Sequence, residues 1–153
     1  MVSQDDLQLR FRWLTSATAI YWVALAVMIH MPPESLDVAP SLMDRLHADK
    51  LFHCGSYGLL AVLLAGIMEL HAELRRATIN LSRTAGTVFI AVAAYGGLDE
   101  LTQPLTNRTC DPWDFAADVV GAALGLFLYR RFLREYFIGP SNGTDDRALE
   151  LKR

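Results

Sequence analysis

The sequence has little cysteine, little charge and no excess of basic residues. Its two cysteines, Cys54 and Cys110, are too few to staple a small secreted scaffold, and no Cys-x-x-Cys pair suggests a zinc site. Lysine and arginine number 14 against 17 aspartate and glutamate residues, so no broad basic surface is available for phosphate contacts. This excludes a nucleic-acid binder. A Gly-x-Ser-x-Gly nucleophile motif is also missing.

What the sequence has in abundance is apolar residues, which make up 52% of its 153 residues, while charged residues make up only 20%. This composition excludes a disordered chain. A bilayer core about 30 Å thick requires about 20 mainly apolar residues in a helix. The sequence therefore predicts an all-α integral membrane bundle of four transmembrane helices within residues 13–138. The four predicted spans are Trp13–Met31, Leu51–Leu70, Thr84–Leu105 and Trp113–Tyr129.

The positions of lysine and arginine predict the orientation, because these residues concentrate in short cytoplasmic segments of membrane proteins. With the N-terminus in the cytoplasm, eleven of the 14 fall inside, and only Arg45, Lys50 and Arg108 fall outside. Both termini are therefore predicted to be cytoplasmic. Residues 1–12 form a short N-terminal segment in this interpretation, and residues 139–153 form a disordered tail that begins with Gly-Pro-Ser-Asn-Gly.

The fourth segment carries Gly121 and Gly125 at a spacing of four residues. Such a Gly-x-x-x-Gly step lets two helices approach each other closely within a bilayer. The pattern favours packing inside the bundle or association of two copies of the chain, so it leaves a homo-oligomer open.

Ten polar residues from separate parts of the chain fall at the predicted outward end of the bundle. Many recur every four residues, a spacing that places side chains on one face of a helix. Charged groups at this depth avoid lipid, so we expect them to face the bundle interior or water. The candidate site residues are Asp49, Lys50, His53, Tyr57, Asp99, Glu100, Gln103, Arg108, Asp114 and Asp118, with Asp111 one turn before Asp114. The other histidines, His30, His47 and His71, are interpreted as interface and loop residues.

This set is strongly acidic, because only Lys50 and Arg108 oppose its carboxylates. The missing positive charge could come from retained protons, from a divalent metal ion or organic cation, or from water that screens the site. The residue types do not distinguish among these three sources of compensation, and the sequence identifies no cofactor. A purely structural role also fits, because polar side chains hold transmembrane helices together.

The order of these residues resembles a known family. Asp49-Lys50-x-x-His53-x-x-x-Tyr57 precedes Tyr95-Gly96-x-x-Asp99-Glu100-x-x-Gln103, then Arg108, then Asp114-x-x-x-Asp118-x-x-Gly121, an order similar to that of the VanZ-like family of bacterial membrane proteins. The resemblance covers residues 49–125, about half of the chain. It implies a multi-pass protein of the bacterial cytoplasmic membrane whose outward polar cluster is its functional centre. The family takes its name from a protein associated with resistance to the glycopeptide teicoplanin, so the resemblance suggests a link to antibiotic resistance.

Three functions fit these patterns, and the sequence favours the first. In the first, an outer pocket binds a lipid headgroup, a lipid-linked envelope precursor or a cation, and Arg108 contacts a phosphate or carboxylate. In the second, a membrane-embedded enzyme acts on an envelope lipid, with His53 or Asp99 as general base and a metal between Asp114 and Asp118 as an option. In the third, the polar groups serve only as structural contacts or as an ion relay.

Overall fold

The computed structural model describes residues 3–31, 48–106 and 108–138, and its regular structure within these ranges is entirely helical. The predicted all-α class is confirmed. The four long helices are α1 (Gln4–His30), α3 (Ala48–Leu74), α4 (Leu81–Thr102) and α5 (Pro112–Leu128). A 3-10 turn, Gln103–Thr106, follows α4, while a π-helical turn, Tyr129–Leu133, and a short helix α6 (Arg134–Ile138) follow α5. The predicted tail, residues 139–153, and the loop residues 32–47 lie outside the described residues.

The helices differ from the predicted spans mainly at their ends. Helix α1 begins at Gln4, because the Ser3 hydroxyl accepts a hydrogen bond from the Asp6 amide and caps the first turn. Most of the predicted N-terminal segment is therefore helical. Helix α4 ends at Thr102, and the last predicted residues of its span form the 3-10 turn. Helices α1 and α3 are each long and apolar enough to cross a membrane.

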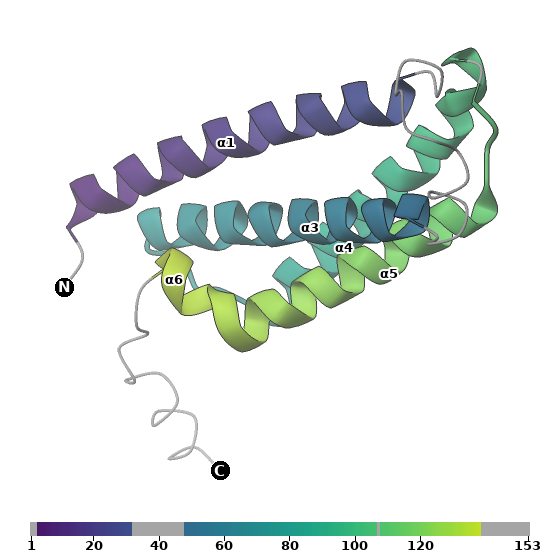
Figure 1. Ribbon diagram of the computed structural model, residues 1–153. Coiled ribbons are helices and arrows are strands. Elements are labelled where there is room, and N and C mark those ends of the chain that lie inside the picture. Colours follow the sequence, from purple (N-terminus) through teal and green to yellow (C-terminus); the bar gives the residue numbers. More distant parts are fainter. Residues whose placement is uncertain (1–2, 32–47, 107, 139–153) are drawn as a thin grey trace, which may run out of the picture.

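Helix α3 is the central element, since it packs against α1, α4 and α5 (Figure 1). The start of α1, the end of α3 and α6 lie at one end of the bundle. At the opposite end, called here the polar end, α3 begins, α4 ends and α5 begins. The helix order thus brings residues near 50, 100 and 115 together in space.

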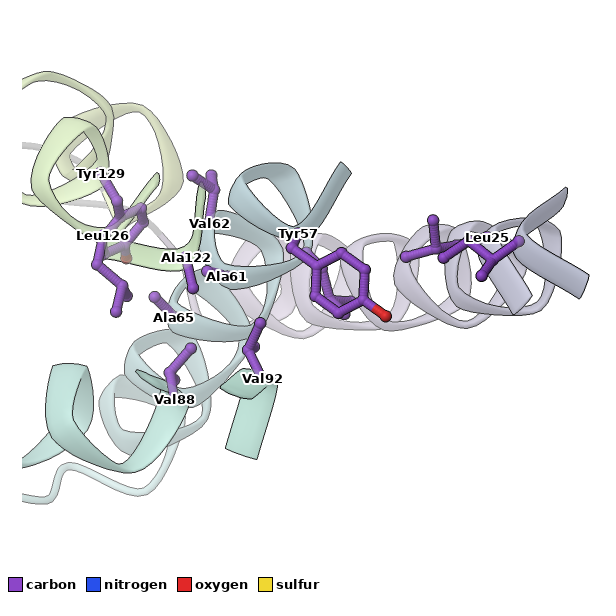
Figure 2. Close-up of a cluster of buried hydrophobic side chains, with 12 residues drawn as sticks. Leu25, Tyr57, Ala61, Val62, Ala65, Val88, Val92, Ala122, Leu126 and Tyr129 are labelled. Carbon is purple, nitrogen blue, oxygen red and sulfur yellow. The ribbon is translucent and has the colours of Figure 1, made fainter. Parts of the chain in front are cut away.

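The apolar core lies mainly along α3 and includes Tyr57, Leu60 and Ala61, packed against Val88 and Val92 of α4 and residues of α5 (Figure 2). Between α3 and α5 the two backbones touch. A Cβ added to Gly121 would overlap the Cys54 carbonyl, and one added to Gly125 would overlap the Gly58 carbonyl.

The Gly-x-x-x-Gly step is therefore used inside the chain, where it sets the distance between α3 and α5. Because the glycine face is covered by α3, it cannot also be the contact between two copies. The association of two copies of the chain through some other surface stays a prediction.

Candidate functional site

The ten predicted site residues all lie at the polar end, and they divide into a buried floor and a partly exposed rim. The floor contains every predicted member that is buried, namely His53, Tyr57, Asp99, Glu100, Gln103, Asp114 and Asp118. The rim contains the remaining predicted members, Asp49, Lys50 and Arg108, and also Asp111, the residue that caps α5.

The start of α5 is fixed by two residues that precede the floor aspartates. Asp111 is the N-cap and its Oδ1 accepts a hydrogen bond from the Trp113 amide at 2.9 Å. Pro112 occupies the first helical turn, where its missing N–H needs no partner. This local arrangement turns Asp114 and Asp118, one helical turn apart, toward α3.

Lys50 connects the rim to the floor. Its Nζ donates to Asp111 Oδ2 and to Asp114 Oδ1, each at 2.9 Å. The hydrogen bond from this ammonium group lowers the pKa of the Asp111 carboxyl below its usual value. The Lys50–Asp111 pair therefore contributes to stability at neutral pH, and its contribution is lost only as the pH falls through that lowered pKa.

Besides the Lys50–Asp114 contact, two hydrogen bonds join α3 to the floor aspartates. His53 Nδ1 donates to Asp118 Oδ1 at 2.9 Å, and the Tyr57 hydroxyl donates to Asp99 Oδ2 at 2.9 Å. The His53 and Tyr57 rings lie nearly parallel, with an interplanar angle of 7°. The two residues lie one turn apart on α3, and the stacking of their rings orients both side chains toward α4 and α5.

Glu100 is held by different partners from its neighbour Asp99. Gln103 Nε2 donates to Glu100 Oε1 at 2.7 Å, and the Asp111 amide donates to Glu100 Oε2 at 3.0 Å. The two adjacent acids of α4 thus enter the floor at different places, as their separation of about 100° around the helix predicts.

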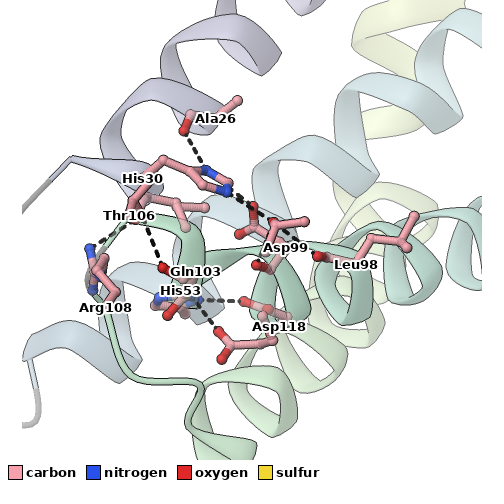
Figure 3. Close-up of polar contacts among 12 residues, drawn as sticks. Ala26, His30, His53, Leu98, Asp99, Gln103, Thr106, Arg108 and Asp118 are labelled. Carbon is pink, nitrogen blue, oxygen red and sulfur yellow. Dashed lines mark hydrogen bonds and ion pairs between the residues drawn. The ribbon is translucent and has the colours of Figure 1, made fainter.

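Helix α1 also reaches the site, which the sequence analysis missed. His30 was interpreted as an interface residue, but its Nε2 lies 3.0 Å from Thr102 Oγ1 and its Nδ1 lies 3.6 Å from Asp99 Oδ1 (Figure 3). Arg108 donates from Nη1 to the Ile29 carbonyl at 3.0 Å, while its Nη2 lies 3.8 Å from Asp49 Oδ1. The sequence did contain a signal, since His30 lies one residue before the outward end of the first predicted span, Trp13–Met31.

The floor carries more negative charge than its neighbours balance. Asp99, Glu100, Asp114 and Asp118 are each at most 4% exposed. Among the described residues, Lys50 supplies the one lysine or arginine nitrogen within 4.0 Å of any of these four carboxylates. Asp118 Oδ2 is buried and has no hydrogen-bond partner within the described parts of the chain. Buried charges are normally paired, so the excess negative charge of the floor requires retained protons, a bound cation or water.

Two sets of side chains in this cluster could hold a metal ion. In each set, one ligand atom per residue lies within 4.8 Å of the others. The first set is Asp49, His53 and Asp114, and the second is His53, Glu100 and Asp118. His53 belongs to both sets, which makes it the central ligand candidate.

The cysteines are free thiols, Cys54 half-buried on α3 and Cys110 exposed before α5. Two surface grooves lie toward the other end of the bundle and contain none of the predicted site residues. The first is bounded by α1, Leu70 and α6 and has a volume of about 510 Å³. The polar cluster is therefore a feature separate from these apolar grooves.

Comparisons of the chain with protein-family models, with curated proteins and with solved structures found no match.

Proposed function

We propose that this chain is a four-span, VanZ-like protein of the bacterial cytoplasmic membrane whose outward polar cluster binds the headgroup of an envelope lipid or lipid-linked precursor. One observation carries the proposal: a buried acidic floor, built from three helices, lies beneath a rim that contains Lys50 and Arg108.

The exposed surface supports the membrane part of this proposal. All four long helices carry large apolar side chains on their outer faces, including Ile20 at 72% exposure, Leu51 at 69%, Ile90 at 69% and Phe127 at 60%. Soluble monomers rarely expose apolar residues on every side, whereas lipid covers such surfaces in a membrane. Trp13 and Tyr136 lie near one end and Trp113 near the other, as interfacial aromatic residues do.

The natural cysteines allow a direct test of the orientation. Cys110 lies before α5 at the polar end and is exposed. We expect a membrane-impermeant maleimide to label Cys110 in intact cells with an intact cytoplasmic membrane, and the Cys110→Ser variant to lose this labelling. In a Cys110→Ser background, Arg83→Cys, at the opposite end, should be labelled only after permeabilisation. Labelling of Cys110 only after permeabilisation would contradict the proposed orientation.

The rim and floor together match a headgroup that contains both a phosphate and neutral or cationic groups. Arg108 has a planar fork of N–H donors, of which one is used by the Ile29 carbonyl. It can therefore bind a phosphate at headgroup depth. The acids beneath it accept hydrogen bonds from hydroxyl or ammonium groups, which an exclusively basic site could not do.

Substitution of Arg108 tests this binding. In phosphatidylcholine nanodiscs, we expect the wild-type chain to bind a fluorescent polyprenyl phosphate and Arg108→Ala to bind it at least about tenfold more weakly, because a charge-assisted hydrogen bond contributes about 1.5–3 kcal/mol. Arg83→Ala removes an exposed arginine from the other end of the bundle and should bind like wild type.

If folded Arg108→Ala and wild type bind the probe equally, Arg108 does not contact the phosphate. Loss of binding in both variants would show a general charge effect rather than a site at the polar end. Susceptibility of cells to teicoplanin, compared between the same variants, tests the resistance phenotype separately.

A second function, an enzyme acting on an envelope lipid, is favoured by the His53–Asp118 hydrogen bond. A carboxylate that accepts from one ring nitrogen orients the imidazole and leaves the other nitrogen able to take a proton. Phosphorus NMR of the purified protein with polyprenyl pyrophosphate tests whether the protein is such an enzyme. Product formation that His53→Gln abolishes would favour the enzyme, and unchanged substrate would favour binding alone.

A further inference from the structure

The buried carboxylate of Asp118 has one oxygen that the described chain does not use. The residue is 1% exposed, its Oδ1 accepts from His53, and its Oδ2 has no hydrogen-bond partner among the described residues. An unpaired carboxylate oxygen in the interior is costly, because its lost hydration is not replaced. A cation bound at Oδ2 would remove this cost.

His53, which forms an ion pair with Asp118 when its ring is protonated, also belongs to a set of metal-ligand side chains around Asp118. One ligand atom each from His53, Glu100 and Asp118 lies within 4.8 Å of the other two. Two ligands bound to one ion at about 2.1 Å are at most about 4.2 Å apart, so small side-chain rotations would complete the site. In the described chain no lysine or arginine nitrogen lies within 4.0 Å of Glu100 or Asp118.

The supporting contacts hold these ligands in place. Gln103 and the Asp111 amide position Glu100, and each of its oxygens still has a lone pair for a metal. Gly96 on α4 lets Asp118 approach this helix closely, since a Cβ there would lie only 2.9 Å from Oδ2. The oxygen without a partner therefore lies against Gly96, where any larger residue would displace it.

We propose that His53, Glu100 and Asp118 bind one divalent transition-metal ion at the floor of the polar cluster. One imidazole and two carboxylates form a mixed nitrogen and oxygen set, which suits Mn²⁺ or Zn²⁺ better than the all-oxygen sites of Ca²⁺. The ion supplies the positive charge that the floor lacks. This site does not depend on the proposed headgroup binding, because its ligands all come from the chain.

Manganese titration tests the site in chelator-treated protein purified in detergent with no added lipid. We expect one Mn²⁺ per chain, with pulsed electron paramagnetic resonance showing a nitrogen coupling from His53. Asp118→Asn should weaken Mn²⁺ binding at least about tenfold, and His53→Gln should remove the nitrogen coupling. Glu135→Gln, which neutralises an exposed acid on α6, should bind Mn²⁺ like wild type. Competition by Zn²⁺ for the same single site would support the mixed ligand set.

A second pair of variants leaves all three ligand residues unsubstituted. Gly96→Ala adds a methyl group beside Asp118 Oδ2, whereas Gly97→Ala meets only Phe115 at an ordinary distance of 3.6 Å. We expect Gly96→Ala to weaken Mn²⁺ binding several-fold and Gly97→Ala to leave it unchanged. The proposal is overturned if folded wild-type protein binds neither Mn²⁺ nor Zn²⁺ at millimolar concentration, or if bound Mn²⁺ shows no histidine nitrogen. Because no lipid is present, these results stand apart from the outcome of the headgroup experiment.

Discussion

Gly121→Ala is expected to destabilise the protein by about 3 kcal/mol, although it adds a single methyl group to a helix. The methyl group would overlap the backbone of Cys54, and a helix backbone cannot move aside as a side chain can. Overpacking a tight contact typically costs about 1–3 kcal/mol, and a contact between two backbones belongs at the upper end of this range. Helices α3 and α5 would have to separate, which would also displace His53 from Asp118.

Gly86→Ala on α4 is the matched control, because a Cβ at Gly86 has no neighbour within 4 Å. Alanine is a better helix former than glycine, so this variant should be unchanged or more stable by about 0.5–1 kcal/mol. Unfolding by sodium dodecyl sulfate, followed by circular dichroism, measures both. Equal stabilities of the two variants would mean that α3 and α5 do not touch at Gly121.

The second large effect concerns the ion pair at the other end of the bundle. Arg134 Nε donates to Glu69 Oε2 at 2.7 Å, and Glu69 is only 2% exposed. Arg134→Met should destabilise the protein by about 3–5 kcal/mol, because it leaves a buried carboxylate without its partner. Adding Glu69→Gln to this variant should recover much of the loss, since the charge is then removed.

Arg130→Met removes an exposed arginine from the same region and should change stability by less than about 0.5 kcal/mol. The same unfolding experiment compares the three variants. If the double variant is no more stable than Arg134→Met, the cost arises from lost packing of the arginine stem rather than from the charge. The Glu69–Arg134 pair is thus a structural contact with balanced charges, in contrast to the polar end.

The apolar segments made the helices predictable, but their ends depended on local contacts. The long helices follow from composition, because about 20 apolar residues in sequence have few other structures available. The early start of α1 depends on the Ser3 cap, and the 3-10 turn after α4 is held by contacts such as that from the Thr106 hydroxyl to the Gln103 carbonyl. Such short-range hydrogen bonds leave only weak signals in composition.

The candidate site was predictable where helical spacing determined it. The four-residue steps through Asp49, His53 and Tyr57 placed side chains on one face, and short connections brought the helix ends together. His30 was missed, because its contact with Thr102 depends on how α1 lies across α4, which spacing within one helix does not encode. The helix that packs on Gly121 and Gly125 could not be predicted either, because a small-residue pattern indicates close packing without identifying the neighbouring helix.

The stability of Asp118→Asn in metal-free protein shows whether the buried acids serve binding or hold the helices together. Asparagine keeps an oxygen that accepts from His53 Nδ1 and removes the charge that the described chain does not balance. If they serve binding, the free energy of unfolding stays within about 1 kcal/mol of wild type or rises, because a binding site stores uncompensated charge. A loss of about 3 kcal/mol or more would show instead that Asp118 is a structural contact between helices.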